Sequence, residues 1–269
     1  MNMTSLVSRI AQKIDAIIRL LCWKILQPKI FLLSGTATVR SDSDWEVANE
    51  IFVHKEYDDA ILQTVHTEQQ QQTRPLRIVD LGANVGFFTL RCIHLYLQTK
   101  CPAPLEVFAV EASANLFADL ERRLSGRGDE NVKLLLKNGL VGRRTGKAMF
   151  HSSWFNSATN QVSRDHKVSR NPLLNRYAEV CEYTDLEQFL PAECEIDLIK
   201  CDIEGSELTF LENYPDLLRR TRRLVIELHP FHCDVQACRN LLNSFGFVQQ
   251  RVIKSYPTHA LEMYDRVRV

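Results

Sequence analysis

The sequence has no net charge, no paired-cysteine motif and no long apolar run. Lys and Arg together number 33, and so do Asp and Glu. Without an excess of positive charge the chain has no general attraction for nucleic acid, so we expect no nucleic-acid partner. The eight cysteines never form a CxxC pair, and no signal peptide with a cleavage site precedes them. This pattern is typical of reduced thiols, and it predicts a cytoplasmic protein without disulfides.

No linker rich in Pro, Gly or Ser divides the 269 residues, of which 45% are hydrophobic. This length and composition favour one large α/β domain with a substantial core. The first 40 residues differ from the rest, because six Lys and Arg residues stand against a single acid, Asp15. We therefore divide the chain into a basic N-terminal segment, residues 1–40, and a domain, residues 41–269.

Apolar residues in the N-terminal segment recur at helical spacing and predict a basic amphipathic helix. They are Leu6, Ile10, Ile14, Ile17, Ile18 and Leu21. The apolar stretch is too short, and too often interrupted by charge, to span a bilayer. Two interpretations stay open: the helix packs on the domain, or it makes a weak contact with a membrane surface or a partner, which would make the protein peripheral.

From residue 76 onward, short β-type runs alternate with helical stretches. We expect strands over 76–81, 105–110, 132–136, 196–201 and 224–228. Helices are expected over 86–97, 113–124, from 205 onward, and from an Asp234 cap to 244, with a further helix opened by a Thr184–Glu187 capping box. The alternation predicts a doubly wound, mostly parallel sheet.

The chain ends in two strand-like runs, residues 247–256 and 260–269, joined by three residues. Three residues leave no room for a crossover helix, so the runs should pair as an antiparallel hairpin. One strand of the sheet should then run antiparallel to the others.

The stretch "VDLGANVGFF", residues 79–88, places two glycines directly after the first expected strand. In an open parallel sheet, this strand-to-helix turn is the usual cofactor contact. Asn84 stands where the dinucleotide pattern GxGxxG has its second glycine, so an NAD-dependent oxidoreductase is the less favoured alternative. Asp80 could accept from an ammonium group, and Glu111 at the next strand end could accept from ribose hydroxyls. The two acids therefore suggest S-adenosylmethionine (SAM).

A second group of charges gathers at the end of the strand in "IDLIKCDIEGSELTFL", residues 196–211. Lys200 and Asp202 share one face of that strand, and Lys200 should pair with Asp202 or Glu204. The next expected strand ends in "VIELHP", which brings His229 to the neighbouring edge. A hydroxyl that attacks a methyl group must lose its proton, so Asp202, Glu204 and His229 are the candidate bases.

Metal binding receives little support from the sequence. The spacing of His229, His232, Cys233 and Cys238 matches no strong zinc pattern. A magnesium site from Asp202, Glu204 and Glu227 is conceivable, and the sequence does not decide it. We assign no metal ligand.

Four motifs together resemble the FkbM family of SAM-dependent methyltransferases. The motifs are "VDLGANVGFFTL", "FAVEASANLFADLERRL", "LIKCDIEGSELTFLE" and "LVIELHPF". The resemblance covers most of the chain but leaves out the first 40 residues. Two departures are Ala112, where the family usually has proline, and Gly139, where it usually has alanine.

The resemblance implies a class I methyltransferase (Rossmann-like) fold: a mostly parallel, seven-stranded sheet with a C-terminal antiparallel hairpin. It also implies O-methylation of a hydroxyl on a sugar, glycan or natural-product acceptor. The cofactor contacts expected from the loop and the resemblance, with Asn138 near the adenine, are Asp80, Gly82, Ala83, Asn84, Gly86, Phe87, Glu111, Asn138 and Asp202. The expected catalytic residues are Lys200, Asp202, Glu204 and His229.

The stretch 150–177 shows neither helical nor strand periodicity, and it carries Trp154, Phe155, Asn156 and Asn160. As an aromatic and amide-rich loop it would suit a carbohydrate acceptor, and as a plain surface loop it would need no explanation.

The alternative from another functional class, that of binding proteins, is a catalytically silent SAM-fold protein that acts as a binding partner through its basic N-terminus.

Overall fold

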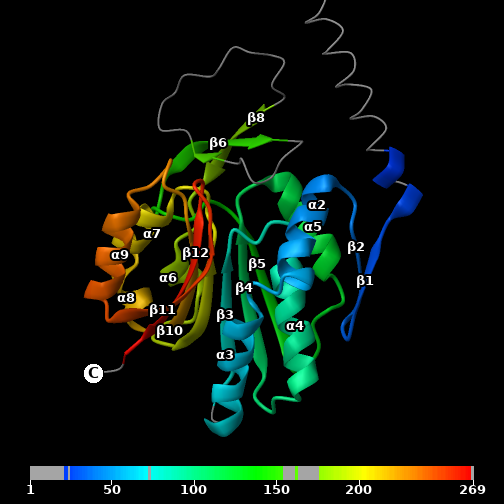
Figure 1. The fold of residues 1–269 in the computed structure, drawn as a ribbon, viewed down its shortest axis with the longest axis horizontal. Helices are drawn as coiled ribbons and strands as arrows, with labels where there is room; N and C mark the ends of the chain where they lie inside the picture. The colour runs from blue at the N-terminus through cyan, green and yellow to red at the C-terminus, as the bar shows by residue number, and fades with distance from the viewer. Residues whose placement is uncertain (1–20, 24, 72–73, 154–160, 163–175, 268–269) are drawn as a thin grey trace, which may run out of the picture.

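The computed structural model describes residues 21–23, 25–71, 74–153, 161–162 and 176–267. Its centre is a seven-stranded sheet with the order β11-β12-β10-β9-β3-β4-β5 (Figure 1). The strands are β3 (Leu76–Leu81), β4 (Leu105–Glu111), β5 (Val132–Asn138), β9 (Ile196–Cys201), β10 (Thr221–Leu228), β11 (Phe247–Ser255) and β12 (Ala260–Arg266). Strand β12 runs antiparallel to both β10 and β11, and the remaining pairs are parallel. The mostly parallel sheet and its C-terminal hairpin are therefore confirmed.

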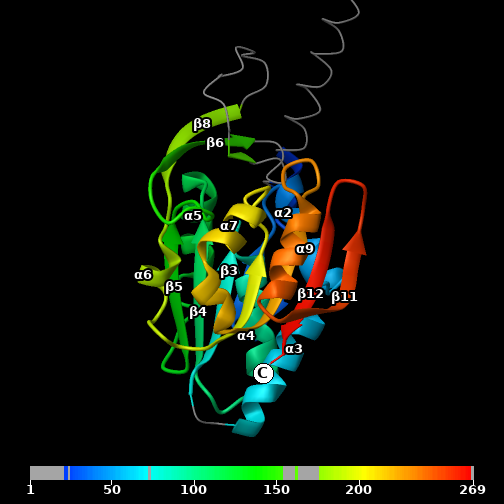
Figure 2. The same cartoon turned by 90° about the vertical axis from the view of Figure 1, so that its left-hand side faces the viewer.

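Helices cover both faces of the central sheet (Figures 1 and 2). On one face lie α3 (Asp58–Gln71), α4 (Phe87–Thr99) and α5 (Ala114–Leu124). On the other face lie α6 (Leu186–Phe189), α7 (Glu207–Asn213), α8 (Pro215–Arg219) and α9 (Val235–Ser244). Successive strand residues supply the two hydrophobic clusters alternately, as Ile78 and Val79 do in β3. Because both faces are buried, the charged residues of β3 and β9 are paired, as Asp80 is with Lys200.

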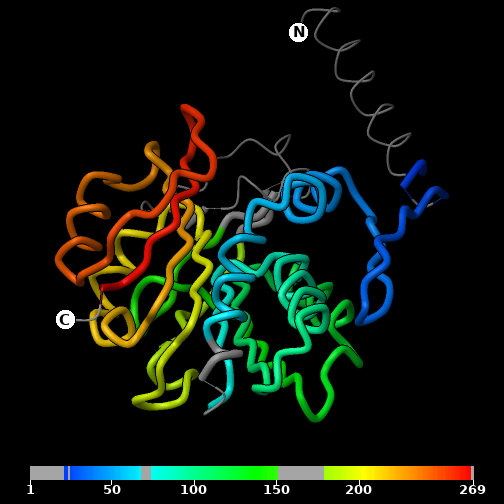
Figure 3. Tube along the Cα trace, turned by 60° about the horizontal axis from the view of Figure 1, so that its bottom comes forward, coloured from blue at the N-terminus to red at the C-terminus, as the bar shows by residue number. Residues whose placement is uncertain are grey.

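Smaller elements surround the central sheet. Strands β6 (Lys147–Ser153), β7 (Gln161–Val162) and β8 (Arg176–Glu182) form a separate sheet, and Figure 2 shows β6 and β8 above one end of the central strands. Strands β1 (Lys29–Leu32) and β2 (Gly35–Thr38) pair on the opposite side of the molecule from the red β11–β12 hairpin (Figure 3). Helix α2 (Asp42–Ala48) and the π-helix η1 (Asn49–Val53) lead from β2 to α3.

The N-terminal segment differs from the expectation, because residues 29–38 are strands and not a helix. Ala37 and Val39 are buried in the core, and the Thr38 carbonyl accepts a hydrogen bond of 2.7 Å from Arg123. Residues 37–39 thus pack with the rest of the chain, and the division at residue 40 stays a prediction. Most of the predicted amphipathic helix lies outside the described residues, as do Trp154, Phe155, Asn156 and Asn160.

The cap of α6 also differs by one residue from the prediction. Asp185 is the N-cap, and its side chain accepts from the Glu187 amide at 3.0 Å. Thr184 is buried, and its amide donates to the Leu140 carbonyl, so it extends the preceding chain and does not open the helix. The predicted Asp234 cap of α9 is confirmed by its hydrogen bond with the Ala237 amide.

Candidate active site

The two glycines of the loop after β3 let neighbouring segments of the chain pack closely against the loop. Gly82 has a φ of +74°, and a Cβ there would lie 1.8 Å from the Asp202 carbonyl oxygen. Gly86 has a φ of +88°, and a Cβ there would lie 2.7 Å from the Leu120 side chain. Glycine tolerates both the positive φ and the contact. The loop consequently lies directly against the end of β9 and under α5.

Glu111, at the end of β4, is held by the same loop. One carboxylate oxygen accepts from the Asn84 amide and the other from the Ser113 amide, each at 2.8 Å. Burial raises the pKa of Glu111 to about 7, against the opposing effect of these two hydrogen bonds. Each oxygen keeps a further lone pair, so the carboxylate can still accept from a ligand hydroxyl.

A pocket of about 540 Å³, partly open to solvent, lies over the carboxyl ends of β3, β4 and β9. Glycine backbone and carboxylates form part of its wall, and apolar side chains form the rest. The lining residues are Gly82, Asn84, Val110, Glu111, Ala112, Leu116, Gly139, Leu140, Val141, Phe150, Asp202, Ile203, Glu204 and Ser206. This donor set fits an adenosyl amino acid, because Glu111 can accept from ribose hydroxyls while apolar side chains cover an adenine.

Asp80 lies behind this pocket and does not line it. Its side chain is fully buried, accepts from the Thr89 hydroxyl at 2.9 Å, and lies 3.5 Å from the Lys200 ammonium nitrogen. Lys200 also donates to the Gly82 carbonyl at 2.6 Å and lies 3.7 Å from Asp202. Burial alone would lower the pKa of Lys200, but Asp80 and Asp202 outweigh it and raise this pKa. The predicted Lys200–Asp202 pair is present, and Lys200 ties β3, the loop and β9 together.

Four other predicted cofactor residues lie outside the pocket lining. Phe87 is buried against the Arg123 guanidinium, 4.1 Å from the ring centre, and Ala83 is buried in the same core. Gly86 caps α4 beneath α5. The Asn138 amide donates to the Glu111 and Ala112 carbonyls at 2.8 and 3.0 Å. These residues shape the pocket, and their direct contact with a cofactor stays a prediction.

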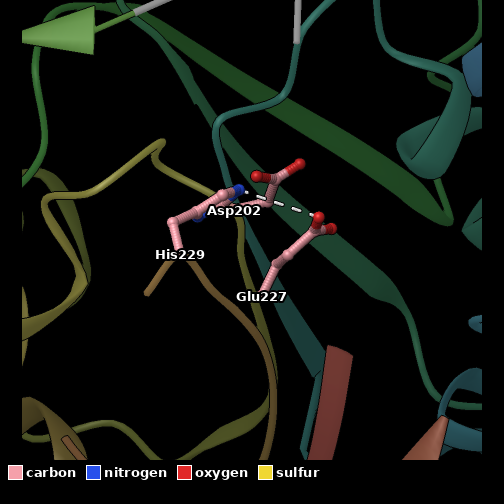
Figure 4. A group of neighbouring side chains, drawn as sticks. All are labelled: Asp202, Glu227 and His229. Carbon is pink, nitrogen blue, oxygen red and sulfur yellow. Dashed lines mark ion pairs between the residues drawn. The ribbon is translucent and has the colours of Figure 1, made fainter. Parts of the chain in front are cut away.

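An acid and imidazole cluster lies beside the pocket, at the ends of β9 and β10. His229 Nδ1 is 2.8 Å from Glu207, while Nε2 is 3.5 Å from Glu204 and 3.7 Å from Glu227. Figure 4 shows Asp202, Glu227 and His229 with their polar groups directed toward one another. Asp202 and Glu204 belong both to this cluster and to the pocket wall. The three candidate bases are therefore brought together at one edge of the pocket.

The cluster holds protons strongly. Burial opposes the His229 cation, but the hydrogen bond and charge of Glu207 outweigh burial, so the pKa of His229 rises to about 10. Burial, and then the charge of Asp202, raise the pKa of both Glu204 and Glu227. A group whose pKa lies above neutral pH holds its own proton there, so Glu204, with a pKa of about 9, and the His229 imidazolium can each accept a proton only after losing that proton.

Two members of the cluster were absent from the predicted catalytic residues. Glu227 was named from the sequence only as a conceivable magnesium ligand, although it stands two residues before His229 and so shares its strand face. The pairing of Ile226 with Cys201 places Glu227 beside Asp202. Glu207 gives no comparable signal, since its sequence position only places it in the first turn of α7.

The strand order and a pocket over the carboxyl ends of the strands define a class I methyltransferase fold. Residues 80–249 match the Methyltransferase FkbM domain family. The chain belongs to this family and is a SAM-dependent methyltransferase, which confirms the resemblance seen in its motifs and replaces the NAD-dependent alternative.

Several known proteins are similar to parts of this chain. "Methyltransferase 1" of Beauveria bassiana is 25% identical over 201 residues, covering 70% of this chain and 78% of that protein. Fibrillarin of Aeropyrum pernix, solved with natively bound SAM, is 13% identical with a TM-score of 0.40, and the match covers 71% of this chain and 67% of fibrillarin. Precorrin-6y C5,15-methyltransferase of Geobacter metallireducens is 11% identical with a TM-score of 0.40 and coverages of 77% and 87%. The family assignment rests on the domain match and not on these distant structures.

Proposed function

We propose that this methyltransferase transfers a methyl group to a hydroxyl of a sugar, glycan or natural-product acceptor. One observation supports the proposal. Asp202 and Glu204 line the pocket that fits an adenosyl amino acid, and both are also members of the acid and imidazole cluster. An acceptor bound at this boundary would have groups beside it that can hold its hydroxyl and take its proton.

On the cofactor side, the backbone of residues 82–84 and the Glu111 carboxylate would hold SAM. When bound, SAM supplies an electrophilic methyl group. Glu111 fixes the ribose, and the buried Asp80–Lys200 pair fixes the Gly82 carbonyl against which the amino-acid end would lie. Because both acids act through a rigid loop, they orient the cofactor before an acceptor arrives.

On the acceptor side, Asp202 orients the hydroxyl and a carboxylate of the cluster accepts its proton. Glu204 is the favoured base, since its carboxyl group lines the pocket; because burial raises its pKa to about 9, it accepts a proton only in its ionised form, which is more populated toward high pH. His229 is assigned a positioning role, because Glu207 and Glu204 hold its ring between them. Alignment of the hydroxyl oxygen with the methyl group accounts for most of the expected rate enhancement.

Incubation with isotopically labelled SAM tests the proposal. We expect label in the hydroxyl ethers of sugars or glycosides from a cell extract, identified by mass spectrometry. Asp202→Asn should still bind SAM but lose at least roughly tenfold in transfer, because the acceptor is misplaced. Label on nitrogen or carbon acceptors alone would contradict O-methylation. Tight SAM binding with equal labelling by the wild type and Asp202→Asn would instead favour the catalytically silent alternative.

The N-terminal region supports a second proposal, a peripheral contact with an anionic membrane surface. Large apolar side chains there are exposed, among them Ile25 (79%), Leu26 (69%) and Phe31 (79%). Basic residues outnumber acids three to one in residues 1–20. Apolar side chains next to positive charge are typical of interfacial segments. Within the described residues, no helix combines the length and apolar character needed to cross a bilayer.

A further inference from the structure

Three potential metal ligands converge at the ends of two neighbouring strands. Asp202 follows β9 directly, Glu227 lies in β10, and His229 follows β10. One ligand atom from each of these three lies within 4.8 Å of those of the other two. Figure 4 shows the imidazole and the two carboxylates facing a common point. The convergence is a property of the sheet, since parallel β9 and β10 end at the same edge.

The histidine of this group is oriented as metal-bound histidines are. Glu207 is fully buried and lies 2.8 Å from His229 Nδ1. The same Glu207 oxygen accepts from the Gly205 amide at 2.9 Å, which fixes the carboxylate in place. With Nδ1 donating to Glu207, Nε2 is the atom that faces Glu227 and Asp202. A carboxylate behind the ligating imidazole is the usual outer support of a metal-bound histidine.

Carboxylates outnumber the basic groups in and around the cluster. The carboxylates of Asp80, Asp202, Glu204, Glu207 and Glu227 surround one ammonium group, Lys200, and two imidazoles, His229 and His259. Lys200 contacts Asp80 and the Gly82 carbonyl as well as Asp202. Asp202 Oδ1 is shielded from solvent and has no hydrogen-bond partner among the residues that the structure describes. A cation at the common point would satisfy this oxygen.

We propose that Asp202, Glu227 and His229 bind one divalent cation of the Mn²⁺ or Mg²⁺ type. Two carboxylates and one imidazole suit Mn²⁺ best among such ions. Ligand atoms on an octahedral ion of this size lie about 3 Å apart in adjacent positions, so small side-chain movements close the observed spacing. Three protein ligands leave positions open for oxygen atoms of the acceptor. This role, holding an acceptor oxygen, rests on the proposed function.

Titration of Mn²⁺ into the full-length protein, after removal of metals with a chelator, tests the site. Electron paramagnetic resonance of the unbound ion counts the bound Mn²⁺ without any need for turnover. We expect one bound Mn²⁺ per chain, at least roughly tenfold weaker binding in Glu227→Gln, and roughly 10- to 100-fold weaker binding in Glu207→Gln, which removes the outer support. Glu56→Gln is the matched control, because Glu56 pairs with Lys254 outside the cluster, and it should bind as the wild type does.

Absence of saturable Mn²⁺ binding, or equal affinity in Glu227→Gln and Glu56→Gln, would overturn the proposal. If Glu227→Gln does not fold, the wild type still decides the question, because bound Mn²⁺ should show magnetic coupling to an imidazole nitrogen. Lack of that coupling excludes His229 as a ligand. SAM binding is also measured on the metal-free protein, so that the two proposals can fail separately. If the protein binds SAM but not Mn²⁺, the cation site alone is rejected. If it binds Mn²⁺ but transfers no methyl group, the proposed function alone is rejected.

Discussion

Gly82 illustrates how one residue determines the geometry of the site. Its φ is positive, and the Asp202 carbonyl oxygen lies so close to it that a Cβ at this position would clash. The sequence predicted only that this turn contacts a cofactor. The structure shows that the turn also packs against the end of β9, so Gly82 joins the loop to the strand that Asp202 follows.

Gly82→Ala should therefore destabilise the protein more than a positive φ alone would. Gly126 is the matched control, since its φ is +70° and a Cβ there would meet nothing within 4 Å. We expect a loss of about 1–2 kcal/mol of unfolding free energy for Gly126→Ala and about 3 kcal/mol or more for Gly82→Ala, measured by denaturant unfolding. Equal losses would show that the contact with Asp202 has no energetic consequence.

Glu111 should make cofactor binding depend on pH. Its pKa of about 7 means that the carboxylate, which we propose accepts from ribose hydroxyls, becomes protonated as the pH falls below neutral. The dissociation constant of S-adenosylhomocysteine should be constant above pH 7 and rise by up to about tenfold per pH unit below it. Glu111→Gln should bind roughly 10- to 100-fold more weakly at pH 8 and lose this dependence. Calorimetry measures both, and a pH profile unchanged by Glu111→Gln would contradict the assignment.

At the scale of elements, the central strands were predictable because their apolar runs are long and end in turn residues. The short strands β1 and β2 were not predictable, since sequences such as "GTAT" have no strong pattern. Their pairing is determined by distant contacts, among them the hydrogen bond from Arg123 in α5 to Thr38. Likewise, the strand pattern located Glu111 correctly at the end of β4, but the burial of Asp80 behind Lys200 depends on a neighbouring strand.

The pair between Asp44 in α2 and Arg123 in α5 should be important for the attachment of the N-terminal elements. The two side chains lie 2.9 Å apart and are 9% and 5% exposed. Asp44→Asn leaves a buried guanidinium without its counter-charge, so we expect a loss of about 3 kcal/mol or more in denaturant unfolding. Asp216→Asn removes an exposed pair with Arg219 and should cost at most about 1 kcal/mol. Similar costs for the two variants would show that the buried pair does not anchor α2.

For the whole molecule, the exposed apolar residues near the N-terminus and the basic segment before them predict binding to anionic vesicles. In flotation experiments, the full chain should bind vesicles containing phosphatidylserine and be released by 0.5 M salt, since salt screens surface charge over roughly 4 Å at this concentration. A variant lacking residues 1–20 keeps β1 and β2 and should bind less. Equal flotation of the two proteins would remove the membrane proposal.

The central claim is that the pocket beside Glu111 and Asp202 holds the adenosyl cofactor. A crystal structure of the protein with S-adenosylhomocysteine tests it most directly. We predict ribose hydroxyls at hydrogen-bond distance, about 3 Å, from the Glu111 carboxylate, with the sulfur atom on the side of Asp202 and Glu204. A ligand bound elsewhere, or one that touches neither Glu111 nor Asp202, would contradict the account.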